Sequence, residues 1–533
     1  MATEPETVDD AAGEDHAIVT RNPATLEVND EIPEAGPEAV EAAVADAAAA
    51  QPAWAERPVE DRLAVLEQFR EVLLERKEAV AETVTAEVGK PAGEAVSAEV
   101  APALSAVEFL SDRGGDLLAE EVPLGTLEAV GDSTVYREPV GVVGMITPWN
   151  YPLGIPASEI APALFAGNAV VLKPAEETTL TAFLLQDLLE EAGLPTDLLQ
   201  VVPGRGEVTG QALAESGVDH LSFTGSTAVG EHLREVTAGT DTSVCLECGG
   251  SDPALVLPDA NLDLTADGIL WARFANAGQS CAAVKRVYAH ETVEPRLRRM
   301  LVERVEGLRV GASEDEGVVE VGPLISAEAV DRLHDKVERS VEMGAEVLTG
   351  GQPLDREGHF YAPTVLTGVT DDMPVVREET FGPVLPVMAY TDIDDAVERA
   401  NDTRYGLTGS VWTTDTERGE AVARRVEAGT VTVNDHLYTF SLHATPWGGY
   451  KDTGGDLSHG RWGVESVTRA KHIHVAEGET GLRAGRFSDL WWFPYDEGTA
   501  ELLGQTMEVM HGSTVTDRLS NVPSLLRKIL DGR

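Results

Sequence analysis

Two cysteine-bearing stretches are the first places in this 533-residue chain where chemistry is expected. VCLECGG (244–250) holds Cys245 and Cys248 at the spacing of a metal-binding or redox pair. The third cysteine, Cys281, stands in FANAGQSCAAVKR (274–286) after a helical pattern, and its small neighbours leave room for a substrate at the sulfur. The first hypotheses are therefore a paired-thiol centre and a lone nucleophile, against the simpler interpretation that cysteines pack as small hydrophobic residues.

The cysteine pair lacks the surroundings that a metal or redox centre needs. The sequence offers neither a second cysteine pair nor a nearby histidine cluster to complete four zinc ligands. A redox pair usually begins a helix, whereas TSVCLEC is typical of the end of a strand. We therefore predict no metal site, and oxidation or metal binding by the pair stays the lesser alternative.

Three further motifs place polar side chains where predicted strands end. ITPWNYPL presents the Asn150 amide from a turn, and VVLKPAEETTL puts Lys173 and Glu176 just beyond an apolar strand. SFTGSTAVGEHL leads into a helix with Ser226 near its N-cap. The carboxyl ends of parallel strands are where open α/β sheets bind ligands. Each motif alone also fits a simpler role, and the last one lacks the full three-glycine dinucleotide fingerprint.

The pattern between these motifs predicts an α/β protein. Helical stretches alternate with short apolar, β-branched runs that begin near residues 141, 169, 199, 220, 243 and 254. Such alternation indicates right-handed βαβ units and a parallel, doubly wound sheet. A second αβ series over 262–445 predicts a second domain, with a ligand cleft between the two. Upstream, 37–86 predicts two amphipathic helices split near Pro58, and a further helix is expected around 92–112.

In this order and spacing, the motifs resemble those of the aldehyde dehydrogenase superfamily over roughly residues 20–475. The matching motifs are Pro-Trp-Asn, Lys-Pro-x-Glu, Phe-Thr-Gly-Ser, Glu-x-Gly-Gly, Gly-Gln-x-Cys and EETFGPVLPV (378–387). The resemblance implies that Cys281 is the nucleophile, Glu247 the base and Asn150 the oxyanion donor. It also implies a set of residues that contact the dinucleotide: Ile146, Thr147, Pro148, Trp149, Lys173, Glu176, Gly206, Phe223, Thr224, Gly225, Ser226, Gly230, Cys248, Gly249, Glu379 and Phe381.

The resemblance implies an NAD(P)-dependent oxidoreductase (EC 1.2.1.-) that converts an aldehyde to the free acid through a thiohemiacetal and a thioester. Glu247 favours release by water, because relatives that pass the acyl group to coenzyme A generally lack it. Glu176 favours NAD over NADP, since a carboxylate accepts a hydrogen bond from a ribose 2′-hydroxyl but repels a 2′-phosphate. The family usually carries Leu at the position of Cys248, so the cysteine pair then becomes a packing feature that brackets Glu247.

The substrate is less closely specified than the reaction. Three segments resemble the succinate-semialdehyde dehydrogenase branch of the family: NYPLGIPASEIAPALFAGN, SCAAVKR and the tail motif SLLRKIL. Better-known enzymes of that activity bind the substrate carboxylate with arginines, whereas the aligned positions here are Ser158 and Ala275. Arg273, Arg286 and Arg461 are the candidates to replace them. A broad-specificity aliphatic or aromatic aldehyde dehydrogenase is the alternative, and a catalytically silent binding or structural family member is the remote one.

Pattern and resemblance together predict a Rossmann-like NAD-binding domain, a second α/β catalytic domain and a small β oligomerisation arm. The expected parts are an acidic flexible tail (1–19), the dinucleotide-binding domain (20–122 and 141–247), the arm (123–140 and 464–476), the catalytic domain (248–463) and a C-terminal extension (477–533). The arm predicts a homodimer or homotetramer. Trp491 and Trp492 are too apolar to be left in water, so we expect the extension to dock on the body or on a neighbouring subunit.

The charge balance narrows the classes of partner. With 92 acidic and 40 basic residues, the formal net charge is −52. A field of this sign opposes phosphate-backbone binding, so no nucleic-acid partner is expected. A hydrophobic fraction of 43% is too high for a disordered acidic chain. We interpret the charge as an adaptation to high salt, where a Debye length of about 3 Å at 1 M screens self-repulsion. An acidic mesophilic enzyme is the alternative.

Cysteine usage and hydropathy predict the compartment. An odd count of three cysteines in so long a chain suggests a reducing environment. The start, MATEPETVDDAAGEDH, lacks the basic and apolar regions of a secretion signal. The most apolar region, 141–172, is interrupted by Pro148, Pro152, Pro156 and Pro162, well short of the roughly 18 residues that span a bilayer. We therefore predict a cytoplasmic protein without a membrane partner.

Overall fold

In the computed structural model, the described residues are 17–121, 132–313, 315, 317–475, 499–511, 513–514 and 522–523. The chain divides into two compact units, Met1–Gly114 with Pro139–Thr468, and Gly115–Glu138 with Arg469–Arg533. The predicted docking of Trp491 and Trp492, like most of the acidic tail, lies outside the described residues. Among the described residues, no helix is long and apolar enough to cross a membrane; the cytoplasmic location stays a prediction.

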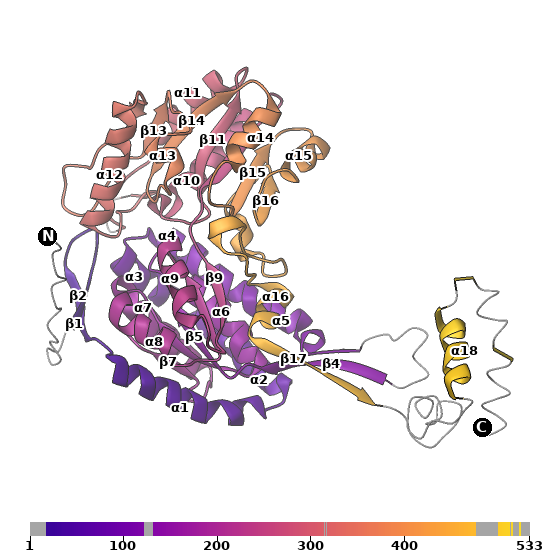
Figure 1. Cartoon of the computed structure of the whole chain (residues 1–533). Helices are drawn as coiled ribbons and strands as arrows, with labels where there is room; N and C mark the ends of the chain where they lie inside the picture. The colour runs from indigo at the N-terminus through magenta and orange to yellow at the C-terminus, as the bar shows by residue number, and fades with distance from the viewer. Residues whose placement is uncertain are drawn as a thin grey trace, which may run out of the picture. The chain divides into compact units, whose positions relative to one another are not determined.

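Five parallel strands form the first sheet of the larger unit (Figure 1). They are β5 (Val142–Ile146), β6 (Ala169–Lys173), β7 (Leu199–Val201), β8 (His220–Thr224) and β9 (Ser243–Glu247). The spatial order is β7-β6-β5-β8-β9, so the chain winds outward from β5 in both directions. Every residue of β5 and β6 is buried, as expected for apolar runs covered on both faces. The predicted doubly wound α/β fold is confirmed.

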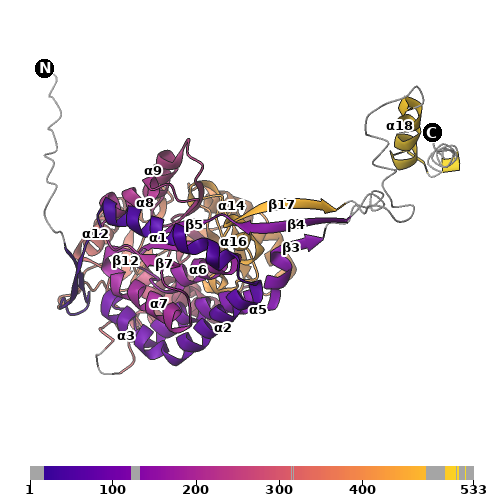
Figure 2. The same cartoon turned by 90° about the horizontal axis from the view of Figure 1, so that it is seen from below.

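Helices cover both faces of this sheet, with α6 and α7 on one side and α1, α8 and α9 on the other (Figure 2). Behind α6 and α7 lie α2 and α3. The bounds are α1 (Pro37–Ala55), α2 (Val59–Glu75), α3 (Lys77–Val88), α6 (Gly154–Ala166), α7 (Thr179–Glu191), α8 (Gln211–Glu215) and α9 (Thr227–Thr237). Ser226 is the N-cap of α9, where its hydroxyl accepts a hydrogen bond from the Val229 amide at 3.4 Å.

Two helical segments differ from the sequence prediction. Residues 37–86 hold parts of three helices rather than two, because Arg76 leaves the helical conformation (φ −102°, ψ 10°) between α2 and α3. No proline or glycine marks that break. The helix expected around 92–112 is present but composite: α4 (Ala92–Ala95) and α5 (Ala101–Leu117) flank a π-helical turn, Val96–Val100. Such turns often occur at functional sites.

A second sheet of seven strands stands beyond the first, in the pink to orange colours of Figure 1. Its order is β12-β13-β14-β11-β10-β15-β16, and only β12 runs antiparallel to its neighbour. The run near residue 254 belongs here, as β10, and not to the first series. The strands are β10 (Asp252–Val256), β11 (Val284–His290), β12 (Glu346–Thr349), β13 (Thr364–Thr367), β14 (Val384–Tyr390), β15 (Thr408–Trp412) and β16 (Thr430–Val433).

The helices of this second series enclose a large apolar core around the seven strands. They are α10 (Leu262–Phe274), α11 (Glu294–Glu306), α12 (Ala327–Glu342), α13 (Pro374–Arg377), α14 (Ile393–Asn401) and α15 (Thr416–Ala423), and α16 (Gly460–Ser466) follows near the end of the unit. Side-chain caps from Asn261 and Ser326 begin α10 and α12. A hairpin of β1 (Ala17–Arg21) and β2 (Val28–Pro33) precedes α1.

A small three-stranded sheet and one helix are described for the second unit. The sheet has the order β17-β4-β3, from β17 (Thr468–Val475), β4 (Asp132–Pro139) and β3 (Ala119–Glu121). Large apolar side chains on it face water, since Tyr136 is 41%, Ile473 44% and Val475 58% exposed. The helix is α18 (Thr499–His511).

Candidate active site

Four strands of the first sheet end in a residue that the sequence analysis singled out. The last residues of β5, β6, β8 and β9 are Ile146, Lys173, Thr224 and Glu247. Because these strands are parallel neighbours, their carboxyl ends share one edge of the sheet. The structure therefore brings side chains from four separate motifs together along that edge, where open α/β sheets bind ligands.

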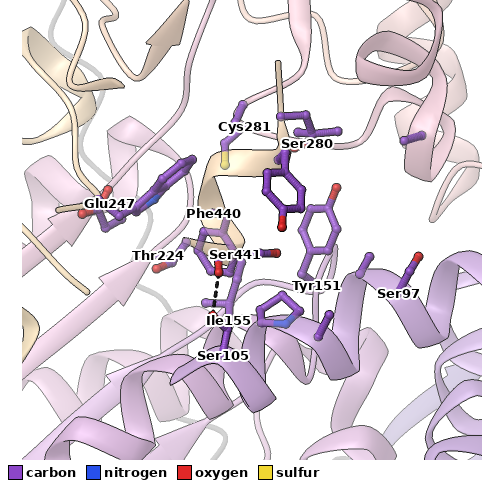
Figure 3. Close-up of a pocket in the computed structure, with 18 of the residues that line it drawn as sticks. Ser97, Ser105, Tyr151, Ile155, Thr224, Glu247, Ser280, Cys281, Phe440 and Ser441 are labelled. Carbon is purple, nitrogen blue, oxygen red and sulfur yellow. Dashed lines mark hydrogen bonds between the residues drawn. The ribbon is translucent and has the colours of Figure 1, made fainter. Parts of the chain in front are cut away.

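A cavity of about 630 Å³ lies beside this edge and is lined from both sheets. Thr224, Glu247 and Cys248 reach it from the first sheet, and Cys281 reaches it from the loop before β11. In Figure 3 the Cys281 sulfur points into the space between Glu247 and Tyr151. The predicted nucleophile and the predicted base thus face one enclosed volume.

The loop that carries Cys281 is held in a strained conformation. After α10, Asn276, Ala277 and Gly278 take positive φ angles of 52°, 54° and 74°. The Gln279 side chain fastens the loop, because its Oε1 accepts from the Ile325 amide at 2.9 Å while its Nε2 donates to the Asn276 carbonyl at 3.2 Å. Backbone strain of this kind persists where the surroundings enforce it, as at active sites.

Asn150 is joined to the same loop. Its Nδ2 donates to the Gln279 carbonyl oxygen at 3.0 Å, and its own carbonyl oxygen accepts from Asn276 Nδ2 at 2.8 Å. The side chain is only 4% exposed. An amide nitrogen has two N–H groups, so one N–H of Asn150 has no partner among the described residues, although Asn150 is not one of the residues that line the cavity.

Burial sets the protonation of the two reactive groups. It raises the pKa of the Cys281 thiol to about 12, against the opposing effect of the Lys285 ammonium. It also raises the pKa of Glu247 well above its ordinary value, and the carboxyls of Glu159 and Asp456 add to that shift. The Ser458 hydroxyl lowers the pKa of Glu247 without reaching hydrogen-bond geometry, so neither carboxyl oxygen has a partner among the described residues. The Cys281 thiol is therefore protonated at neutral pH before ligands bind, and burial favours the protonated form of Glu247 over its ordinary ionised form.

The sequence analysis missed Lys285, which lies behind the nucleophile. It is 1% exposed, and its Nζ donates to the carbonyl oxygens of Gly250 and Cys281, both at 3.1 Å, and to Glu379 Oε1 at 3.2 Å. Two adjacent basic residues in the buried strand β11, Lys285 and Arg286, were the available signal, because buried charges require partners.

A second missed pair supports the turn that carries Asn150. Lys90 and Glu99 form a fully buried ion pair, and Lys90 Nζ also donates to the Asn150 carbonyl at 3.0 Å. Glu99 Oε2 accepts from the amides of Leu153 and Gly154 at 3.0 and 2.8 Å. The pair thereby fixes both ends of the turn.

The residues predicted to contact adenosine form one cluster. Lys173 Nζ lies 3.8 Å from Glu176 Oε1, which in turn accepts from the Gly206 amide at 2.8 Å. Burial lowers the pKa of Lys173, and Glu176 opposes that shift. Thr147 is tied to the same place, since its amide donates to the Lys173 carbonyl at 3.1 Å.

The remaining predicted cofactor residues meet in pairs, two of which join the first α/β series to the second. Trp149 and Phe381 make an edge-on ring contact at 5.6 Å, and Pro148 lies beside Trp149 in the chain. A Cβ on Gly249 would collide with the Glu379 carboxyl. Close approaches also join Gly225 to the Phe223 ring, and Gly230 to Cys248, where an added Cβ would lie 2.7 Å from the sulfur. All three cysteines are free thiols.

The arginines considered for a substrate carboxylate do not reach the cavity. Arg273 is buried and donates to the carbonyls of Thr380 and Val284, and Arg286 donates to the Ser251 carbonyl. Arg461 pairs with Glu465 on α16. The expectation that one of them replaces the missing carboxylate ligand is wrong for the described lining of the cavity.

Residues 10–473 match the model of the aldehyde dehydrogenase family. A Mycolicibacterium smegmatis chain provisionally named an NADP(+)-dependent succinate-semialdehyde dehydrogenase is 39% identical over 444 residues, 83% of this chain and 85% of its own. The betaine aldehyde dehydrogenase of Bacillus subtilis is 37% identical, over 79% of this chain and 86% of its own.

Solved structures are similar throughout the same region. Mycobacterium tuberculosis aldehyde dehydrogenase in complex with NAD+ superposes with a TM-score of 0.82 at 36% identity, covering 90% of this chain and 97% of its own. The succinate-semialdehyde dehydrogenase of Burkholderia pseudomallei superposes with a TM-score of 0.83 at 34% identity, covering 87% and 95%. The chain belongs to the aldehyde dehydrogenase family. It is an NAD(P)-dependent oxidoreductase that acts on an aldehyde (EC 1.2.1.-).

Proposed function

We propose that the chain oxidises its aldehyde to the free carboxylic acid, with Cys281 as nucleophile, Glu247 as base and Asn150 as oxyanion donor. The observation that carries this proposal is that the Cys281 thiol and the unpartnered Glu247 carboxyl face one cavity between the two sheets. A carboxyl kept out of water without hydrogen bonds has the raised pKa that suits a general base near neutral pH.

The chemistry begins at sulfur. The Cys281 thiolate forms a C–S bond to the carbonyl carbon, and the carbonyl oxygen becomes an oxyanion. Asn150 Nδ2 and the Cys281 amide stabilise that oxyanion, each by about 3 kcal/mol. A bound nicotinamide dinucleotide supplies the hydride acceptor. Loss of hydride from the same carbon leaves a thioester on Cys281.

Glu247 then acts on water. Its carboxylate takes one proton while the water oxygen bonds to the acyl carbon, and the C–S bond breaks to release the acid and the thiolate. The sum is aldehyde, water and oxidised dinucleotide converted to acid, reduced dinucleotide and a proton. Hydrolysis, rather than transfer to another acyl acceptor, is supported by a base that faces the cavity.

The residues at the edge of the first sheet fit a dinucleotide. The Thr227 hydroxyl at the start of α9 is buried and without a partner among the described residues, at a helix N-terminus where phosphate groups bind. Lys173 and Glu176 would hold the adenosine ribose, and Glu379 the nicotinamide ribose. We propose NAD as the preferred form, because the Glu176 carboxylate repels a 2′-phosphate.

A rapid-mix experiment tests the roles. In saturating NAD, Cys281→Ser should form no NADH in a single turnover while still binding NAD. Glu247→Gln should give part of a stoichiometric NADH burst and then stall as a thioester, because its block follows hydride transfer. A burst from Cys281→Ser, or steady turnover by Glu247→Gln at the wild-type rate, would contradict the assignment.

We also propose that the chain forms a dimer or tetramer through the three-stranded sheet. Edge strands with exposed apolar side chains pair readily with another chain. Among the described strands, β17 has β4 on one side only, and Ile473 and Val475 on it are exposed.

The relatives named succinate-semialdehyde dehydrogenases favour that substrate, whereas the cavity favours a broader aliphatic or aromatic aldehyde. Apolar and aromatic side chains dominate its wall, including Ile155, Leu437, Phe440 and Trp447. We propose the second alternative.

A further inference from the structure

The ionisable side chains on the wall of the active-site cavity carry one sign of charge apart from its thiols and phenols. The described residues that line it include the carboxyls of Glu94, Glu108, Glu159 and Glu247, and they include no lysine, arginine or histidine. A carboxylate brought into this cavity would therefore face carboxyls and no basic side chain among the described residues of its wall. Juxtaposed like charges are a strong means of rejecting a ligand.

The four carboxyls are not equally free to meet a ligand. Glu247 is assigned to catalysis, and Glu159 already accepts hydrogen bonds from Ser222 at 2.5 Å and Thr224 at 3.1 Å. Glu108 on α5 is exposed and lies 3.5 Å from Arg70. Glu94 on α4 is half-buried, and since the Lys90 ammonium and the Asn276 backbone amide both favour its charged form, it is the carboxyl best suited to meet a charged substrate group.

Glu94 lies near the reactive centre without belonging to it. Glu94, Tyr151 and Cys281 all line the cavity, and burial raises the pKa of the Tyr151 phenol, an effect to which Glu94 and Cys281 both add. Figure 3 shows Tyr151 beside Ser280 and Cys281, above Ile155. Burial also raises the pKa of Glu94 to about 7, an effect that Lys90 opposes. A cation in the cavity would favour its ionised form.

Aromatic side chains complete the surroundings of such a cation. Five line the cavity: Tyr151, Trp271, Tyr438, Phe440 and Trp447. Ammonium groups are attracted to the faces of aromatic rings, and most strongly where water is excluded. Carboxyls and aromatic rings around one enclosed volume are therefore suited to an alkylammonium group and unsuited to a carboxylate.

We propose that this cavity selects aldehydes by charge, preferring an aldehyde whose far end bears an ammonium group over its uncharged isostere, and rejecting one that bears a carboxylate. The inference rests on the proposed function, because the aldehyde group must reach Cys281. It places Glu94 as a specificity-determining residue and counts against a semialdehyde of a dicarboxylic acid as substrate.

A matched set of aldehydes tests the selection. 4-(Trimethylammonio)butanal and 5,5-dimethylhexanal share size and shape and differ in charge, and glutarate semialdehyde supplies the anion. NADH formation is followed in saturating NAD at pH 8, at the lowest KCl concentration at which the circular dichroism spectrum is native. We expect kcat/KM for the cation to exceed that of the isostere at least tenfold, and the anion to fall at least tenfold below it.

A variant assigns the effect to a residue. Glu94→Gln should reduce the cation-to-isostere ratio of kcat/KM severalfold, mainly by lowering kcat/KM for the cation. Glu67→Gln, an exposed carboxyl on α2 that does not line the cavity, is the matched control and should leave the ratio unchanged.

The outcomes separate the inference from the function on which it rests. Two results for the wild-type protein would overturn charge selection and leave the proposed function intact. One is a kcat/KM for glutarate semialdehyde above that of the isostere, and the other is a kcat/KM for the cation no higher than that of the isostere. An unchanged ratio in a folded Glu94→Gln protein would overturn the role of Glu94. No NADH from any of the three aldehydes would overturn the proposed function itself and, with it, the inference.

Discussion

Lys285 Nζ lies 3.2 Å from Oε1 of Glu379, and the same ammonium donates to the Cys281 carbonyl at 3.1 Å. One buried cation therefore links the loop of the proposed nucleophile to the residue proposed to hold the nicotinamide ribose. It also opposes the effect of burial on the Cys281 pKa. Movement of Glu379 toward a bound ribose would leave more of the lysine's charge for the thiol.

Removing the charge of Lys285 should slow the reactions of the Cys281 thiol. In Lys285→Met the Cys281 pKa should rise, and since the thiolate is the nucleophile, alkylation by iodoacetamide at a fixed pH should slow about tenfold for each unit of rise. The measurement is the pH profile of the alkylation rate. Lys77→Met, which removes an exposed lysine paired with Glu78, is the control and should leave the profile unchanged. An unshifted profile in Lys285→Met would show that the lysine only supports the loop.

The raised pKa of Glu247 predicts a distinct pH dependence for acid release. The base acts as a carboxylate, so steady-state turnover should be lost as the pH falls through its raised pKa, above the range of an ordinary glutamate. The NADH burst precedes that step and should not show this limb. Stopped-flow bursts and steady-state rates over pH 5–9 check both expectations. A burst and a steady state with identical profiles would place the titrating group before hydride transfer.

The chain's local patterns predict the edge of the first sheet well. Lys173, Thr224 and Glu247 end apolar runs, and parallel strands necessarily align their carboxyl ends, so local sequence sufficed to group them. The break at Arg76 was missed because no proline or glycine marks it.

Pairs distant in the chain escaped sequence reasoning for a different reason. Lys285 and Glu379 are brought together by the packing of β11 against the segment before β14, and neither local pattern encodes that approach. The Lys90 and Glu99 pair depends on a π-helical turn where a regular helix was expected. Glu94 belongs to none of the motifs, and only the folded structure shows that it lines the same cavity as Tyr151.

The Lys90 and Glu99 pair should be important for stability and for the position of Asn150. Lys90→Met leaves a buried carboxylate uncompensated, which typically costs about 3–5 kcal/mol. Adding Glu99→Gln should recover part of the loss, because the unpaired charge is then absent. Arg76→Met, which breaks a half-exposed pair with Glu191, should cost about 1 kcal/mol or less. Thermal melting of the four proteins compares the costs, and equal midpoints for the Lys90 and Arg76 variants would refute the assignment.

The three-stranded sheet should govern assembly. Light scattering should give a multiple of the 56.7 kDa chain mass. Ile473→Pro removes a backbone donor and disrupts the edge strand β17, so it should shift the population toward the single chain. Ile473→Val keeps the β-branched apolar side chain and the donor and should leave assembly unchanged. A wild-type protein that scatters as a single chain would contradict the proposal.

Cys248 tests whether the Cys-x-x-Cys spacing has a role in the reaction. Burial raises the pKa of its thiol to about 12, with Glu247 adding to the shift, so the sulfur is a poor nucleophile. Its sulfur packs against Gly230 on α9, so a change in side-chain volume at this position affects the packing of the helix.

Cys248→Leu should therefore keep the NADH burst and steady turnover, with at most a modest loss of stability from the larger side chain. Cys245→Ala, on the buried strand β9, is the companion variant and should behave alike in the burst. Rapid mixing in saturating NAD measures the NADH burst and the steady rate of both variants. If either variant lost the burst while Cys281→Ser retained it, the cysteine pair, and not Cys281, would be the centre of the chemistry.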